Sequence, residues 1–150
     1  MSTSVVRHVI LLILLAAAAV KDYKKREIPL YLTLGPILII SILHISGIVH
    51  RLGMADAAGA AAVFLVCCEF GMTTVFGGGD VLLLVMTELF IGIRAYHVFL
   101  LCCAVVCALI LVMKLCFLPG LKIHSVPLAP VILYAYVMYL IFTAAAAWMA

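Results

Sequence analysis

Residues 97–117 read HVFLLCCAVVCALILVMKLCF and contain one formally charged side chain, Lys114, near their C-terminal end. A helix that crosses the hydrocarbon core of a bilayer needs about 20 predominantly apolar residues. This stretch has that length and composition. Its apolar positions are continuous, whereas a barrel strand would alternate apolar and polar positions. The stretch therefore predicts a membrane-spanning α-helix.

The composition of the whole chain agrees with this expectation. Of its 150 residues, 69% are hydrophobic and 10% are charged, and the mean hydropathy is +1.43. A soluble domain carries about 45–50% apolar residues and about 25% charged ones. A water-soluble fold of this size cannot hide so much apolar surface, so lipid is the expected solvent for most of it. We expect one all-α integral membrane domain over residues 1–150.

Five further apolar runs predict helices of the same kind. They cover residues 5–20, 29–49, 55–70, 79–93 and 126–149. The second is expected to begin at Pro29, because proline suits the first turn of a helix. The fourth is only about 22 Å long at 1.5 Å per residue. The chain is thus expected to form about six transmembrane helices.

The basic residues predict the orientation, because cytoplasmic loops are enriched in lysine and arginine. If the first span ends in the cytoplasm, six basic residues are cytoplasmic and three lie outside. The cytoplasmic set is Lys21, Lys24, Lys25, Arg26, Lys114 and Lys122, and the outer set is Arg7, Arg51 and Arg94. Both termini are then expected to face outward.

Two aspartates share one side of the membrane in this topology. Asp22 follows the first span and Asp80 begins the fourth, so that two spans separate them. An even number of crossings returns the chain to the same face. A carboxylate near lipid is costly, at about 2.5–3.5 kcal/mol for Asp in mid-helix and less near an end. The sequence therefore suggests a pair of carboxyl groups at the cytoplasmic membrane boundary.

Such a pair has a definite chemistry. Two carboxylates a few ångströms apart do not both ionise readily, so one retains a proton. The ionised group can accept a proton from water that attacks a peptide carbonyl, and the protonated group can polarise that carbonyl. The pair titrates as a unit, which leaves acid and base unassigned. This hydrolysis needs no cofactor, and the scattered histidines predict no metal site.

Each of these residues also has a simpler interpretation. Asp22, among basic residues, is typical of a solvated helix end, and Asp80 has the position of an N-cap for the fourth helix. Gly77, Gly78 and Gly79 are compatible with a plain reversal. The combination favours a functional site, because three glycines before Asp80 remove side chains where an extended substrate backbone would approach.

Three stretches carry a resemblance to a known family. Residues 76–83, FGGGDVLL, resemble the Gly-x-Gly-Asp motif of the type IV prepilin peptidases, which are GxGD-type aspartic peptidases. Residues 22–30, DYKKREIPL, resemble the region after that family's first span, and residues 126–130, VPLAP, resemble the proline-bearing start of its last span. The chain resembles a short form that lacks the cysteine-bearing insert associated with N-methylation.

The resemblance implies an endopeptidase of a bacterial or archaeal cytoplasmic membrane. Its substrates would be prepilin-like subunits of type IV, Flp/Tad or archaeal filaments, from which it would remove a short basic leader on the cytoplasmic side. Asp22 and Asp80 match the catalytic positions. Leu30 stands where asparagine is usual, and Leu82 stands where lysine often occurs. These two departures affect expected substrate contacts more than bond cleavage.

Other residues near the pair are candidates for substrate binding or gating. They are Gly77, Gly78, Gly79, Arg26, Pro29 and Glu69. Arg26 is a candidate partner for an acidic residue of the pilin helix. Glu69 is a candidate for binding a basic leader or tuning the pair, with a plain interfacial charge as the alternative. Glu88 lies deep in the fourth span, where an ionisable group is a functional candidate, and a partnered or snorkelling structural role is the interpretation we favour. Asp56 is expected to face outward without a specific role.

Other functions remain open on the residues alone. A non-catalytic scaffold or a proton-coupled transport subunit is the main alternative, with Glu88 as its strongest support. A presenilin-type peptidase pairs Tyr-Asp with Gly-x-Gly-Asp, whereas this chain reads Asp22-Tyr23. The basic residues form no stripe with aromatics, so nucleic-acid binding is not expected. The cysteines, without Cys-x-x-Cys spacing, are expected to be small buried side chains.

Overall fold

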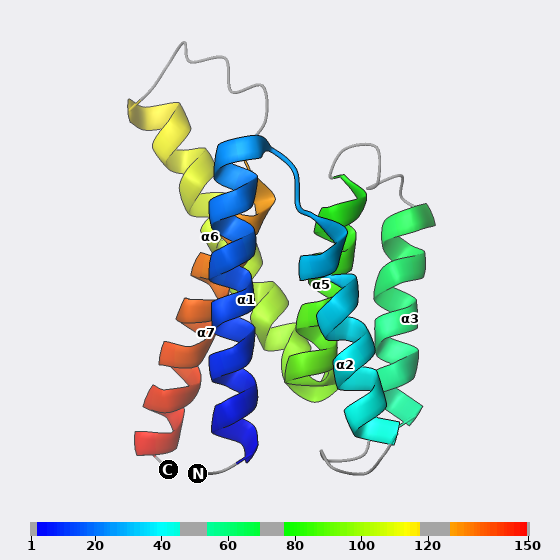
Figure 1. Ribbon diagram of the computed structural model, residues 1–150. Coiled ribbons are helices and arrows are strands. Elements are labelled where there is room, and N and C mark those ends of the chain that lie inside the picture. Colours follow the sequence, from blue (N-terminus) through cyan, green and yellow to red (C-terminus); the bar gives the residue numbers. More distant parts are fainter. Residues whose placement is uncertain (1–2, 46–53, 70–76, 118–126, 150) are drawn as a thin grey trace.

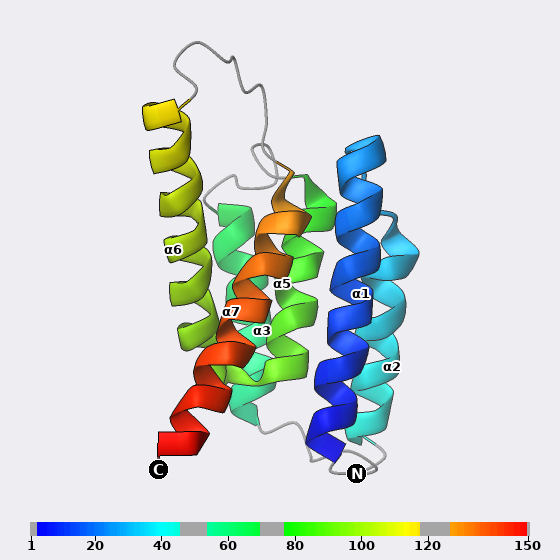
Figure 2. The same ribbon diagram turned by 90° about the vertical axis from the view of Figure 1, so that its left-hand side faces the viewer.

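A computed structural model describes residues 3–45, 54–69, 77–117 and 127–149 of the chain. In these ranges it contains six α-helices, one short 3-10 helix and no strand. The N- and C-terminal ends lie at the same end of the bundle (Figure 1). A view from the side gives the same arrangement (Figure 2). The all-helical class predicted from the composition is confirmed.

The helices follow the predicted spans closely, except for the second. They are α1 (Thr3–Lys25), η1 (Leu30–Leu32), α2 (Leu34–Ile45), α3 (Met54–Glu69), α5 (Gly78–Ile91), α6 (Ile93–Phe117) and α7 (Leu128–Met149). Three predicted span ends lie outside the described ranges. They are the end of the second span, within residues 46–53, the end of the third span at residue 70 and the start of the sixth span at residue 126.

The expectation that the second helix begins at Pro29 is wrong. Pro29 has extended backbone angles of φ −68° and ψ 135° and caps the short 3-10 helix, while α2 begins only at Leu34. The reason lies in Pro36. In a helix that started at Pro29, Pro36 would lack the N–H for a bond to residue 32, and its ring would clash with that carbonyl. Starting at Leu34 places Pro36 in the first turn, where proline is tolerated.

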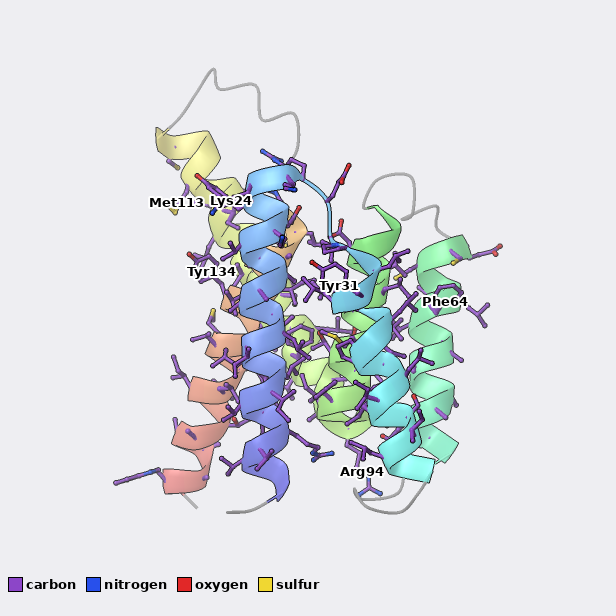
Figure 3. All side chains as sticks on the ribbon, viewed as in Figure 1. Lys24, Tyr31, Phe64, Arg94, Met113 and Tyr134 are labelled. Carbon is purple, nitrogen blue, oxygen red and sulfur yellow. The ribbon has the colours of Figure 1, made fainter. Side chains whose placement is uncertain are left out.

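Within the described residues, two helices are long and apolar enough to cross a membrane. They contain the segments Ile93–Met113 and Leu128–Trp148, with mean hydropathies of 2.7 and 1.9. Only 17% and 33% of these segments are buried in the protein, unlike the core helix of a soluble domain. Phe64, Met113 and Tyr134 point away from the bundle (Figure 3) and are 44–63% exposed. Extensive exposed apolar surface is typical of a membrane-facing side, whereas six spans stay a prediction.

The core forms where three helix pairs pack together: α1 with α7, α6 with α7, and α3 with α5. Its largest fully buried apolar side chains come from α1, α5, α6 and α7 and include Leu11, Leu15, Leu83, Met86, Phe99, Ile132 and Tyr136. A hydrogen bond of 2.7 Å between His8 Nδ1 and Tyr136 Oη adds a polar contact between α1 and α7. The first and last helices are thereby held side by side.

A tight corner joins α5 to α6. Gly92 has a positive φ of 86°, and its N–H donates to the carbonyl of Glu88 at 2.7 Å. The next N–H, of Ile93, donates to Asp56 Oδ1 at 3.0 Å. Asp56 therefore caps the start of α6 from α3, which corrects the expectation that it has no specific role.

We predict that Gly92→Ala destabilises the fold by about 1 kcal/mol, because a side chain is unfavourable in the left-handed region. Thermal unfolding in detergent, followed by circular dichroism, measures the effect. Gly35→Ala is the matched control, because a Cβ at that position in α2 meets no atom within 4 Å. Equal unfolding temperatures for the two variants would contradict the assignment.

Candidate active site

Asp22 lies in the last turn of α1 and is only 6% exposed. Its Oδ2 accepts a hydrogen bond from the N–H of Ala129 at 3.0 Å. Ala129 belongs to the first turn of α7, where backbone N–H groups lack partners within the helix. The Asp22 carboxylate thus caps α7 and lies at the favourable end of that helix dipole. The simpler interpretation of Asp22 as a solvated helix end is therefore wrong.

The chain turns sharply after α1. Arg26 adopts a positive φ of 57°, and its N–H donates to the carbonyl of Asp22 at 2.8 Å. A left-handed residue is a common way to end a helix, although glycine or asparagine usually supplies it. This conformation directs the segment from Glu27 to Pro29 toward the start of α5.

Asp80 lies in the first turn of α5. Its own N–H donates to the carbonyl of Gly77 at 3.0 Å, and Gly77 is the N-cap residue of the helix. Asp80 is therefore not the N-cap, which corrects the simpler interpretation. Its negative charge is nevertheless placed favourably, because the N-terminus of a helix carries a partial positive charge.

One of the three glycines before Asp80 makes close packing possible. A Cβ on Gly79 would lie 2.9 Å from the Ile28 Cβ and 3.1 Å from the Ile28 carbonyl oxygen. At Gly78 a Cβ would meet nothing within 4 Å, and at Gly77 it would lie 4.0 Å from Asp80 Oδ2. Gly79 therefore lets the segment after α1 pack against α5, whereas Gly77 leaves space beside Asp80 and a Cβ on Gly78 would enter open space away from it.

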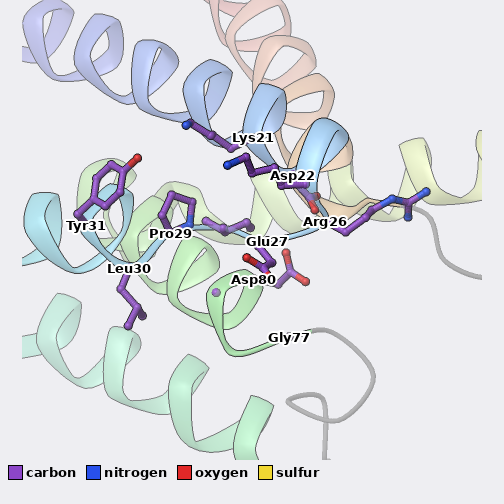
Figure 4. Close-up of a pocket in the computed structure, with 12 residues that line it drawn as sticks. Lys21, Asp22, Arg26, Glu27, Pro29, Leu30, Tyr31, Gly77 and Asp80 are labelled. Atoms are coloured by element: carbon purple, nitrogen blue, oxygen red, sulfur yellow. The ribbon is translucent and has the colours of Figure 1, made fainter.

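These elements enclose a cavity of about 630 Å³ at the end of the bundle opposite the termini. It is lined by Lys21, Asp22, Lys25, Arg26, Glu27, Ile28, Pro29, Leu30, Tyr31, Gly77, Gly79 and Asp80. Asp22 and Asp80 point into the same space (Figure 4), and Asp22 lies close enough to act electrostatically on Asp80. The fold thus brings together two carboxyl groups that are 58 positions apart in the sequence.

The other predicted residues divide between this cavity and its surroundings. Four of them line it, namely Arg26, Pro29, Gly77 and Gly79. Gly78 and Glu69 do not line it, and Glu69 is exposed at the end of α3. Leu30, one of the two departures from the family pattern, also lines the cavity. The roles proposed for these residues in substrate binding stay predictions.

Glu27 is a cavity residue that the sequence interpretation missed. It is exposed, and it lines the same cavity as Asp80. In the sequence it ends a run of basic residues and resembles part of their solvated cluster. The isoleucine and proline that follow it are the available signal, because an apolar residue before proline indicates an extended segment rather than a continuing helix.

Glu88 lies outside this cavity. It is fully buried, and in the described part of the chain neither of its carboxyl oxygens has a hydrogen-bond partner. A Cβ on Gly59 of α3 would lie 2.9 Å from Glu88 Oε1, so that a glycine at this position makes room for the carboxyl group. A partnered structural role was expected for Glu88, but the described residues provide no hydrogen-bond partner for its carboxyl group.

Comparison with known proteins gives one match. The model of a family described as the type IV leader peptidase family matches residues 9–144. The matched region contains both aspartates and the three glycines. Searches of curated proteins and of solved structures return no match.

We predict that Gly79→Ala lowers the thermal unfolding temperature and separates the segment at Ile28 from α5, because the added Cβ would overlap Ile28. Overpacking of this kind costs about 1–3 kcal/mol. Gly78→Ala is the control, since its Cβ enters open space. Thermal unfolding of the two purified variants decides the matter, and an unfolding temperature that drops only in Gly78→Ala would refute the packing described here.

Proposed function

The chain belongs to the type IV leader peptidase family, and from this premise we propose that it is a membrane-embedded aspartic endopeptidase of prepilin-like subunits. Membership of the family indicates a protease. The observation that carries the aspartic mechanism is the position of Asp22 and Asp80 on one cavity, within electrostatic range of each other. The proposed product is a subunit without its short basic leader.

In the proposed reaction, water is the nucleophile and the two carboxyl groups share one proton. The ionised carboxylate accepts a proton as the water oxygen bonds to the peptide carbonyl carbon. The protonated carboxyl group donates a hydrogen bond to the carbonyl oxygen. When the tetrahedral intermediate breaks its C–N bond, a proton passes from the pair to the departing amine. Acid and base are properties of the pair, not of one residue.

The glycines beside Asp80 suit the approach of an extended substrate. Gly77 is exposed, lines the cavity and has no Cβ that would approach the Asp80 carboxyl group, and the neighbouring Gly78 is exposed and adds no side chain. A peptide backbone can therefore come close to Asp80 from this side. Gly79 acts differently, because Ile28 packs into the space that a side chain at position 79 would occupy. We propose that Gly77 and Gly78 admit the substrate and that Gly79 fixes the cavity wall.

We propose a six-span topology in a cytoplasmic membrane, with the cavity on the cytoplasmic side. Lys24 lies at the cavity end of the bundle and Arg94 at the opposite end (Figure 3), which agrees with the predicted segregation of basic residues. Arg51 and Lys122 lie outside the described ranges. Helix α5, with 14 residues, is about 21 Å long and thus shorter than the hydrocarbon core of about 30 Å. A short α5 supports access of water to Asp80.

A basic leader calls for an acidic contact near the catalytic pair. Glu69 was the candidate from the sequence, but it does not line the cavity. Glu27 does, and its side chain is exposed there. We propose that Glu27 contacts a basic side chain of the leader close to the cleaved bond.

We predict that Asp22→Asn and Asp80→Asn each reduce cleavage of a co-expressed prepilin by about 10²–10⁴-fold, the usual contribution of a general acid or base. Asparagine at position 22 can still accept the Ala129 N–H, so this variant is expected to remain folded. Asp22→Ala also loses the cap and about 1 kcal/mol of stability. Gel mobility of the prepilin measures cleavage, and full activity in either asparagine variant would exclude the mechanism.

We predict that Glu27→Gln raises KM about two- to fivefold for a leader with a basic residue next to the cleaved bond, because an exposed ion pair contributes about 0.2–1 kcal/mol. A neutral residue at that leader position should remove the difference between wild type and variant. Glu69→Gln is the control and should leave both KM values unchanged. A larger effect of Glu69→Gln than of Glu27→Gln would transfer the role to Glu69.

A further inference from the structure

An apolar cavity opens on a second side of Asp80. It has a volume of about 190 Å³ and is contributed by four helices. Its lining includes Cys67 of α3, Asp80 and Leu84 of α5, Cys103 and Cys107 of α6, and Ile132 of α7. Asp80 is the only formally charged residue among those that line it. Asp80 thus lies between two cavities. One is the cavity around the Asp22–Asp80 pair, called the charged cavity below, and the other is apolar.

This apolar cavity continues along the bundle. A further cavity of about 450 Å³ shares Cys67, Leu84 and Leu100 with it and reaches Ile93 at the α5–α6 corner. The two together are called the apolar groove below. Ile93 lies 13 positions after Asp80, which corresponds to about 20 Å at 1.5 Å per residue of helix. The groove therefore has the dimensions of several helical turns.

The position of α6 leaves the groove open. Helix α6 packs mainly against α7 and much less against α3 and α5. From the corner at Gly92 onward it diverges from α5, in both views of the bundle (Figures 1 and 2). Leu100 and Cys107 on α6 are consequently exposed on the side of the groove, and Leu100 is 43% exposed. The groove is accessible from the apolar surface of the bundle.

We propose that the apolar groove binds the hydrophobic helix of the substrate that directly follows the cleaved bond, an inference that rests on the proposed function. Asp80 lines both the charged cavity and the groove. A peptide bond held at the Asp22–Asp80 pair therefore has charged surroundings on one side and apolar surroundings on the other. A segment with a basic leader and an apolar helix matches both sides, whereas a lipid chain matches only the groove.

The lining of the groove is suited to a helix in lipid. Helices in a bilayer associate through close packing at small residues, because lipid provides no hydrophobic driving force between them. Cys67, Cys103 and Cys107 place small, polarisable side chains along the groove nearest to Asp80. The expectation that all cysteines are buried is wrong. Cys68, Cys107 and Cys116 are exposed, and Cys103 is partly exposed.

Photocrosslinking in vesicles tests the proposal. A small diazirine amino acid, close to leucine in size so that it does not fill the groove, is placed at position 100 or at position 101 of the full chain. Leu101 is the matched control, because it is 65% exposed but lines neither part of the groove. The probe is a synthetic segment with a basic leader and one apolar helix. We expect a crosslink yield about tenfold higher at position 100 than at position 101, because only position 100 faces the docked helix. Equal yields, or crosslinks at position 100 only to lipid or to a second copy of the chain, would overturn the proposal.

Kinetics separate this proposal from the proposed function. Leu100→Trp fills the groove and is expected to raise KM for the full probe about tenfold without lowering kcat, whereas Leu101→Trp should leave KM unchanged. If wild type cleaves the probe and both variants behave alike, the groove is not the docking site and the protease function stands. If the protein labelled at position 100 crosslinks the probe but wild type does not cleave it, the protease function fails and the docking site stands.

Discussion

The hydrogen bond from the Ala129 N–H to the Asp22 carboxylate joins the first and last helices at the end of the bundle where the cavity lies. It gives the start of α7 a partner that its own helix cannot supply, and it fixes the direction of a side chain that would otherwise extend into solvent. Because Asp22 is held in this way, the chain after it can turn at Arg26 and pack Ile28 against Gly79. The cavity and its pair of carboxyl groups depend on these contacts together.

The two ends of the bundle carry carboxyl groups in different settings. Asp22 and Asp80 line a cavity that also contains basic residues and an exposed glutamate, so water and a peptide can reach them. Toward the α5–α6 corner, Glu88 is fully buried and faces Gly59, while Asp56 caps α6. A proton path was the strongest alternative to proteolysis, and it relied on Glu88. Glu88 is fully buried and its carboxyl oxygens have no hydrogen-bond partner among the described residues, whereas the Asp22–Asp80 pair lines a cavity that suits hydrolysis.

Individual residues show how far the pattern of the sequence reaches. The apolar runs located the helices, but the proline rule was applied to Pro29 when Pro36 limits the helix. The three adjacent glycines are equivalent in the sequence. Only at Gly79 does the absence of a side chain let a residue from another segment, Ile28, pack closely. Glu69 was selected from its place at the end of an apolar run, whereas Glu27 lines the cavity. The limit at Pro36 is local, because it follows from the missing N–H of proline. For Gly79 and Glu27 the deciding contacts are with segments far apart in the chain, about which local periodicity carries no information.

By itself the sequence determined an all-helical chain with apolar runs of spanning length, and it identified Asp22 and Asp80 as its two informative carboxyl groups. Composition and periodicity suffice for this, because the demand for satisfied backbone hydrogen bonds in an apolar solvent leaves few alternatives to a helix. Only the tertiary structure decided that Asp22 caps α7, that Glu27 lines the cavity of the pair and that an apolar groove leads away from Asp80. These features arise from the packing of helices against one another, where a few side chains set the distances between segments that are remote in sequence.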